Sequence, residues 1–68
     1  MTWIIHGPDR KRSYNASACR SIILQDECIG LDYGGPMVPL AFENSAEAAQ
    51  AFKYLMEALQ RKDGVVQL

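Results

Sequence analysis

The sequence has little of what large, secreted or membrane proteins need, beginning with length. Its 68 residues suffice for one small domain, and a core of that size rarely supplies more than about 3–5 kcal/mol of net stability. No apolar run approaches the ~20 residues of a membrane-spanning helix. Neither charge sign dominates, since seven Lys and Arg stand against eight Asp and Glu. The sequence therefore argues against a multidomain enzyme, a membrane protein and a generally basic nucleic-acid binder.

Cysteine and histidine are also scarce, which limits the available chemistry. Cys19 and Cys28 are too few for a disulfide framework, and the N-terminus lacks the basic and long apolar regions of a secretory signal. We therefore expect a cytoplasmic protein with reduced thiols. A structural zinc site needs four closely spaced ligands and a catalytic histidine needs a nucleophile beside it, but His6 is the only histidine. The sequence predicts no enzyme activity, no metal and no cofactor.

Four segments have the composition of β-strands, being rich in β-branched, aromatic and alternating apolar residues. They are residues 2–6, 19–25, 28–33 and 37–42. Asp26-Glu27 and Gly34-Gly35 separate the last three, and two-residue turns at both places bring the larger apolar side chains to one face. The residues of that face are Ile22, Leu24, Ile29, Leu31, Tyr33, Val38, Leu40 and Phe42.

The pattern changes to helical spacing after Phe42. Asn44, with Glu47 as its capping-box partner, is placed to cap a helix, and Ser45 is the other candidate for the cap. Apolar residues then recur at helical spacing through residues 45–62. Gly64 is placed to end the helix in the left-handed conformation. The sequence thus predicts one C-terminal helix with a single apolar face.

These elements predict an α+β fold in a single small domain, residues 1–68. A four-stranded antiparallel β-meander packs one face against the C-terminal α-helix, because neither element has another cover. A basic loop, residues 7–18, joins the first strand to the second. Pro39 places the fourth strand at an edge, and the pattern leaves open which face of the first strand is buried.

Three stretches of the chain carry a resemblance to known proteins. They are Tyr14-Asn15-Ala16-Ser17, Leu31-Asp32-Tyr33-Gly34-Gly35 and Phe42-Glu43-Asn44-Ser45-Ala46-Glu47-Ala48-Ala49. From Tyr14 to Leu59 the chain resembles small bacterial and phage proteins of unknown function that consist of a short β-meander and one helix. The resemblance implies a phage or mobile-element context and an accessory or inhibitor role, such as blocking a host defence complex. It transfers no catalytic residue.

The second face of the predicted sheet is the first candidate site. It carries isoleucine, methionine and small residues without lysine, which is unusual for a solvated sheet. Scattered apolar residues are also normal on surfaces, so a face without function stays open. We predict a protein-interaction module that binds a larger protein or a second copy of itself, because so small a domain gains much from association. The predicted contact residues are Ile23, Cys28, Met37 and Ala41.

A basic segment supplies the alternative. Residues 1–20 carry four bases against one acid, net +3, whereas residues 21–50 carry five acids and no base, net −5. A basic loop can contact phosphates while an aromatic ring stacks on a base, although a merely solvated loop has the same composition. The alternative prediction is a small nucleic-acid-binding domain. Its predicted contact residues are Arg10, Lys11, Arg12, Tyr14 and Arg20.

Overall fold

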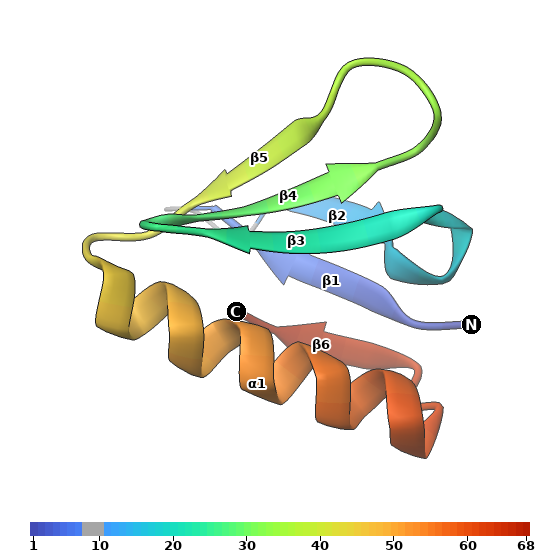
Figure 1. Cartoon of the computed structure of the whole chain (residues 1–68). Helices are drawn as coiled ribbons and strands as arrows, with labels where there is room; N and C mark the ends of the chain where they lie inside the picture. Colours follow the sequence, from blue (N-terminus) through green and yellow to red (C-terminus); the bar gives the residue numbers. More distant parts are fainter. Residues whose placement is uncertain (8–10) are drawn as a thin grey trace.

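The computed structural model, which describes residues 1–7 and 11–68, has an α+β fold with one C-terminal helix (Figure 1). Its strands are β1 (Trp3–His6), β2 (Arg12–Asn15), β3 (Ser21–Gln25), β4 (Cys28–Asp32), β5 (Val38–Ala41) and β6 (Val65–Gln67). A short 3-10 helix, η1 (Ala16–Ala18), follows β2, and the α-helix α1 (Ser45–Arg61) follows β5. The predicted fold class and the predicted C-terminal helix are confirmed.

Strands β3, β4 and β5 form the antiparallel meander that the sequence predicts for these segments. Asp26-Glu27 makes the two-residue turn between β3 and β4, and Asp26 adopts a positive φ of 49° there. Leu24 pairs with Ile29, which pairs in turn with Leu40. Both predicted registers are confirmed, because a slip of one residue would place these side chains on opposite faces.

The connection between β4 and β5 keeps the predicted register but opens into a wide loop (Figure 1). Pairing ends at Leu31 and Val38, so both strands are shorter than the predicted segments 28–33 and 37–42. The Asp32 carboxylate accepts a 2.8 Å hydrogen bond from the Gly34 backbone N–H, and Gly34 has a φ of 101°. This local turn takes the chain out of the ladder before the two glycines.

The first strand is not part of the meander, which corrects the predicted four-stranded sheet to a three-stranded one. Instead β1 pairs antiparallel with β2 and parallel with β6, in a second three-stranded sheet of order β2-β1-β6. Strand β2 lies within the predicted basic loop 7–18, and β6 lies in the tail after the helix. The sequence pattern indicates neither strand, because Arg12–Asn15 is polar and Val65–Gln67 is too short to show a period.

The hydrophobic core lies between the two sheets and α1. Its largest side chains are fully buried and come from β1, β4, β5 and the helix: Ile4, Ile29, Leu31, Leu40 and Leu55. The helix packs on β3, β4 and β6, and Figure 1 shows it along one side of the β3-β4-β5 sheet. Burial of Ile4 settles which side chain of β1 points inward. Leu24 and Tyr33, predicted for the buried face, each remain 37% exposed because they lie at its margin.

The two ends of α1 differ in how well the sequence predicts them. Asn44 Oδ1 accepts a 2.8 Å hydrogen bond from the Glu47 backbone N–H, so Asn44 and not Ser45 is the cap. At the other end the left-handed residue is Lys62, with a φ of 60°, rather than Gly64. No helix within the described residues is long and apolar enough to cross a membrane.

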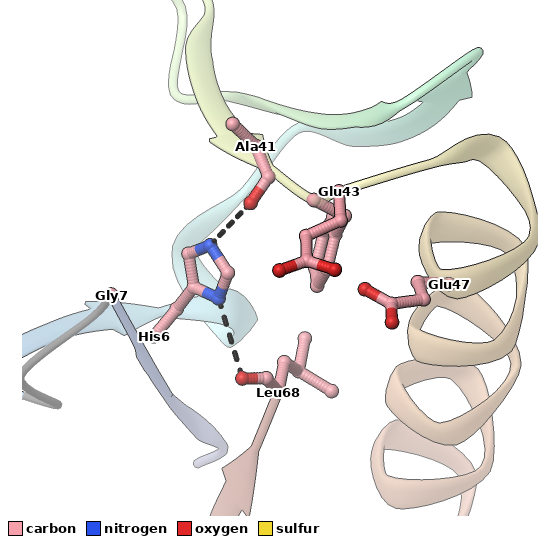
Figure 2. Close-up of a pocket in the computed structure, with 7 residues that line it drawn as sticks. His6, Gly7, Ala41, Glu43, Glu47 and Leu68 are labelled. Atoms are coloured by element: carbon pink, nitrogen blue, oxygen red, sulfur yellow. Dashed lines mark hydrogen bonds between the residues drawn. The ribbon is translucent and has the colours of Figure 1, made fainter.

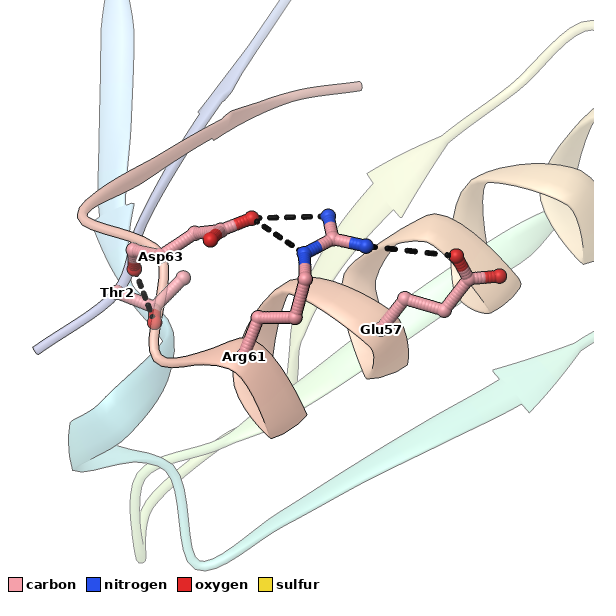
Figure 3. A network of polar contacts seen from close by, with 4 residues as sticks. All are labelled: Thr2, Glu57, Arg61 and Asp63. Atoms are coloured by element: carbon pink, nitrogen blue, oxygen red, sulfur yellow. Dashed lines mark hydrogen bonds and ion pairs between the residues drawn. The ribbon is translucent and has the colours of Figure 1, made fainter.

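Polar contacts fasten the end of α1 to the start of the chain (Figure 3). Thr2 is buried, and its hydroxyl donates a 2.6 Å hydrogen bond to the Asp63 carbonyl oxygen. Arg61 pairs with the Asp63 carboxylate at 2.9 Å and with Glu57 at 3.7 Å. The Arg61 pairs are exposed and therefore contribute little, whereas the buried Thr2 contact holds β6 in line beside β1.

Candidate functional site

The face of the β3-β4-β5 sheet that points away from α1 carries the side chains predicted to bind a partner. Ile23 pairs with Gly30, and Cys28 pairs with Ala41, so these residues share the face opposite to the buried one. Figure 1 shows no element of the described chain on that side of the sheet. We call this surface the outer face. It consists of Ser21, Ile23, Gln25, Cys28, Gly30, Asp32, Met37, Pro39 and Ala41.

Met37 lies over the middle of the outer face because Gly30 has no side chain. A Cβ atom added at Gly30 would lie 2.8 Å from Met37 Sδ and 2.9 Å from Met37 Cγ. Ile23 and Pro39 pair with Gly30 from either side, so they flank the methionine in one apolar row. Ile23 is 37% exposed and Met37 is 42% exposed. A flexible thioether at the middle of an open apolar row can adapt to partners of different shape.

Asp32 supplies the one charged side chain among the residues of the outer face. Its carboxylate accepts hydrogen bonds from the Gly34 backbone N–H at 2.8 Å and from the Ser21 hydroxyl at 3.2 Å. These bonds hold the charge at the end of β4, beside the loop. The remaining predicted contact residues are Cys28, which is half-buried, and Ala41, which is exposed. The middle of the face is therefore apolar and uncharged.

The residues predicted to bind nucleic acid occupy different surroundings. Arg10 lies outside the described residues. Lys11 and Arg12 are exposed where β2 begins. Tyr14 is half-buried and packs against the hydrophobic core, so its ring is not fully available for stacking.

Arg20 lies toward the opposite end of the molecule from Arg12. Arg12 lies opposite His6 in the register of β1 and β2. The His6 ring in turn contacts the Ala41 carbonyl oxygen, at the C-terminal end of β5. The Arg20 backbone N–H bonds the Asp32 carbonyl, at the C-terminal end of β4. Because β4 and β5 are antiparallel, these are opposite ends of the sheet, about 13 Å apart along β4. The structure does not gather these two bases into one patch.

A hollow of about 450 Å³ lies where β1, β5 and the start of α1 meet (Figure 2). The carboxylates of Glu43 and Glu47 point into it, opposite the His6 ring. His6 Nε2 lies 3.0 Å from the Ala41 carbonyl oxygen, and His6 Nδ1 lies 3.4 Å from the Leu68 carbonyl oxygen. A neutral imidazole carries one N–H and therefore donates to only one of these two oxygens. Either contact joins the end of β1 to a neighbouring strand.

Cys19 and Tyr33 meet beside the start of η1. The Tyr33 hydroxyl donates a 3.0 Å hydrogen bond to the Asn15 carbonyl oxygen, and Cys19 Sγ lies 3.9 Å from the same oxygen. Burial raises the pKa of the Cys19 thiol, and the charge of Asp32 adds to the rise, while a hydrogen bond with Tyr33 opposes it. Burial of the hydroxyl end, together with Cys19, raises the pKa of Tyr33 to about 12. A thiol held in its protonated form is a poor nucleophile.

Metal-binding residues do not converge within the described part of the chain. No group of three His, Cys, Asp or Glu side chains there is placed to hold a metal ion. Both cysteines are free, with Cys28 on the outer face and Cys19 beside η1. The site with the clearest geometry is therefore the outer face.

The packing of Met37 on Gly30 is the feature of this site that sequence reasoning missed. A signal for it exists, since a glycine in the middle of a strand often marks a close approach by another group. Gly30 stands at the middle of the alternating segment 28–33. The pattern does not name the group that approaches, because Met37 arrives from a loop whose path is set by the turn at Gly34.

Comparisons of the chain with protein-family models, with curated proteins and with solved structures found no match. The resemblance to small bacterial and phage proteins therefore stays a prediction.

Proposed function

We propose that the chain is a non-enzymatic protein-interaction module that binds another polypeptide through its outer face. The row formed by Ile23, Met37 and Pro39 carries this proposal, because it is apolar, exposed and free of lysine. Apolar patches with polar rims on small proteins are typical of interaction sites. The proposed contact residues are Ile23, Cys28, Met37 and Ala41.

Substitution of Met37 by aspartate tests the proposal. M37D places a charge in the middle of the row without removing a buried side chain, so the helix signal in circular dichroism stays unchanged. A46D is the matched control, since it adds the same charge at an exposed position of α1. Immobilised wild type and A46D should retain the same protein from lysate of the native host, and M37D should lose it.

Once the captured partner is purified, its affinity for each variant can be measured. Titration calorimetry should give equal dissociation constants for wild type and A46D, and a constant at least tenfold higher for M37D. Equal affinity of M37D and wild type would refute the assignment of the outer face. Loss of the helix signal in M37D would show that Met37 belongs to the core.

Exposure of Lys11 and Arg12 supports one alternative function, a small nucleic-acid-binding domain. Binding of this kind weakens steeply with salt, because it releases counterions from the phosphates. Titration of single- and double-stranded oligonucleotides at two salt concentrations tests it, with R10A, R12A and R20A as variants. Affinity that none of these substitutions changes would rule the alternative out.

A further inference from the structure

The backbone of β4 shows which edges of the outer sheet are free to pair. The Phe42 N–H donates a 2.9 Å hydrogen bond to the Glu27 carbonyl oxygen. Backbone groups of successive strand residues point to alternate sides, so Ile29 and Leu31 also face β5. The backbone N–H and C=O groups of Cys28, Gly30 and Asp32 on β4 therefore point to β3. Their partners are Gln25, Ile23 and Ser21, and this leaves the backbone groups of Ile22 and Leu24 at the open edge of β3.

The opposite edge, on β5, is closed to another strand. By the same alternation its outward-facing residues are Pro39 and Ala41. Pro39 has no N–H group to donate, and the Ala41 carbonyl oxygen already contacts His6 at 3.0 Å. Proline and a covered carbonyl are devices that protect natural edge strands from pairing.

The β3 edge has no such protection. Its five residues, Ser21–Gln25, contain no charge and no proline, and no described strand pairs with its outer side. Ile23 on one face and Leu24 on the other each remain 37% exposed. Long apolar edges without protection are templates for pairing with another chain.

We propose that two copies of the chain pair antiparallel through β3 and form one continuous six-stranded sheet. This deepens the proposed function, on which it rests in treating the chain as an interaction module, by naming a second copy as the partner of the edge. A register centred on Ile23 places Ile22 opposite the partner's Leu24. Both residues turn their backbone groups to the edge, so this register forms ladder hydrogen bonds on both sides of the centre.

Charge supports the same register. Centring on Ile23 brings the chain at Arg20, just before β3, toward the partner's Asp26 in the turn after it. In the monomer the Arg20 side chain lies 3.5 Å from the Cβ position of Gly34, so it turns from that loop to the partner's carboxylate when the pair forms. The two-fold symmetry repeats this pair at the other end of the shared edge. A shift of the centre to Ile22 or Leu24 would separate these charges. Both α-helices then lie on one side of the joined sheet, and the two outer faces are continuous on the other.

Charge reversal with mutual rescue tests the pairing. Sedimentation equilibrium from micromolar to millimolar concentration should show a monomer–dimer equilibrium for the wild type. R20E or D26K alone should weaken it about tenfold, because two cross-strand pairs change from attraction to repulsion. The double variant R20E/D26K should recover the wild-type constant. K53E, a charge reversal at an exposed position of α1, is the control and should leave the constant unchanged.

Amide hydrogen exchange locates the interface independently. The N–H groups of Ile22 and Leu24 should gain protection as concentration rises, while the N–H of Ala41, which faces outward on β5, should not. A wild type that stays monomeric at millimolar concentration would overturn the pairing. So would a dimer in which these two amides gain no protection, or one insensitive to both single reversals.

The outcomes separate this pairing from the proposed function. M37D changes the outer face and not the β3 edge, so it should lose the captured partner and still dimerise. R20E should bind the captured partner as the wild type does and dimerise poorly. A monomeric wild type that binds its partner through Met37 would refute the pairing alone.

Discussion

Replacement of Gly30 by alanine should leave the fold intact and displace Met37 from the outer face. The new Cβ would lie 2.8 Å from Met37 Sδ, well inside the ordinary carbon contact distance of about 3.5–4.0 Å. Met37 is exposed and flexible, so its side chain can rotate away while β4 stays in place. The three atoms nearest to that Cβ position all belong to Met37, and each atom contact that Met37 loses on moving away costs about 0.1–0.2 kcal/mol.

The net change in the free energy of unfolding for G30A should therefore be small. Alanine restricts the unfolded chain and by itself stabilises by about 0.4–1 kcal/mol, which offsets the lost methionine contacts. Urea denaturation followed at 222 nm should show a change within about 1 kcal/mol of wild type. In an M37A background the same substitution should stabilise, because the group that it displaces is gone.

A different result would refute the reasoning about Gly30. A loss of more than about 3 kcal/mol in both backgrounds would be of the size expected for overpacking or strain. It would mean that the added Cβ meets the backbone or the core rather than Met37. If M37A alone unfolded the chain, Met37 would be a core residue and the outer face would not be free.

Three further predictions concern the helix cap and the cluster beside η1. N44A should lower the free energy of unfolding by about 1 kcal/mol in urea, because the Glu47 N–H loses its acceptor; no change would contradict the cap. In a C28S variant, burial should keep Cys19 slow toward a disulfide reagent until the pH exceeds that needed by free cysteine; a rate equal to free cysteine would contradict this. Because the pKa of Tyr33 is raised to about 12, its contribution to the free energy of unfolding should be fully present below pH 10 and should be lost between pH 10 and 12. Y33F should show a smaller fall in the free energy of unfolding over this range, and an identical fall would count against the cluster.

Local sequence patterns predicted the meander of β3, β4 and β5, but they did not predict the long-range pairing of the second sheet. The register of β3, β4 and β5 follows from two turns and the alternation of side chains, as with Leu24, Ile29 and Leu40. The pairing of β1 with β6 joins Trp3 to Val65, far away in the chain. Nothing local in three residues such as Val65–Gln67 indicates a parallel partner, and only the packed structure selects it.

The candidate site was predictable to the same degree. Alternation along the strands placed Ile23, Cys28 and Ala41 on one face of the sheet, and the structure has them there. The position of Met37 over Gly30 depends on the path of a loop, which side-chain alternation does not encode.

Photochemical cross-linking tests the central claim, that the outer face binds another polypeptide, most directly. A benzophenone amino acid is placed at position 37 of the full chain, and in a second variant at position 46 on α1, and both are irradiated in cells of the native host. If the outer face binds a partner, one discrete protein adduct forms from position 37 and none from position 46. Adducts from position 46 with none from position 37 would contradict the claim.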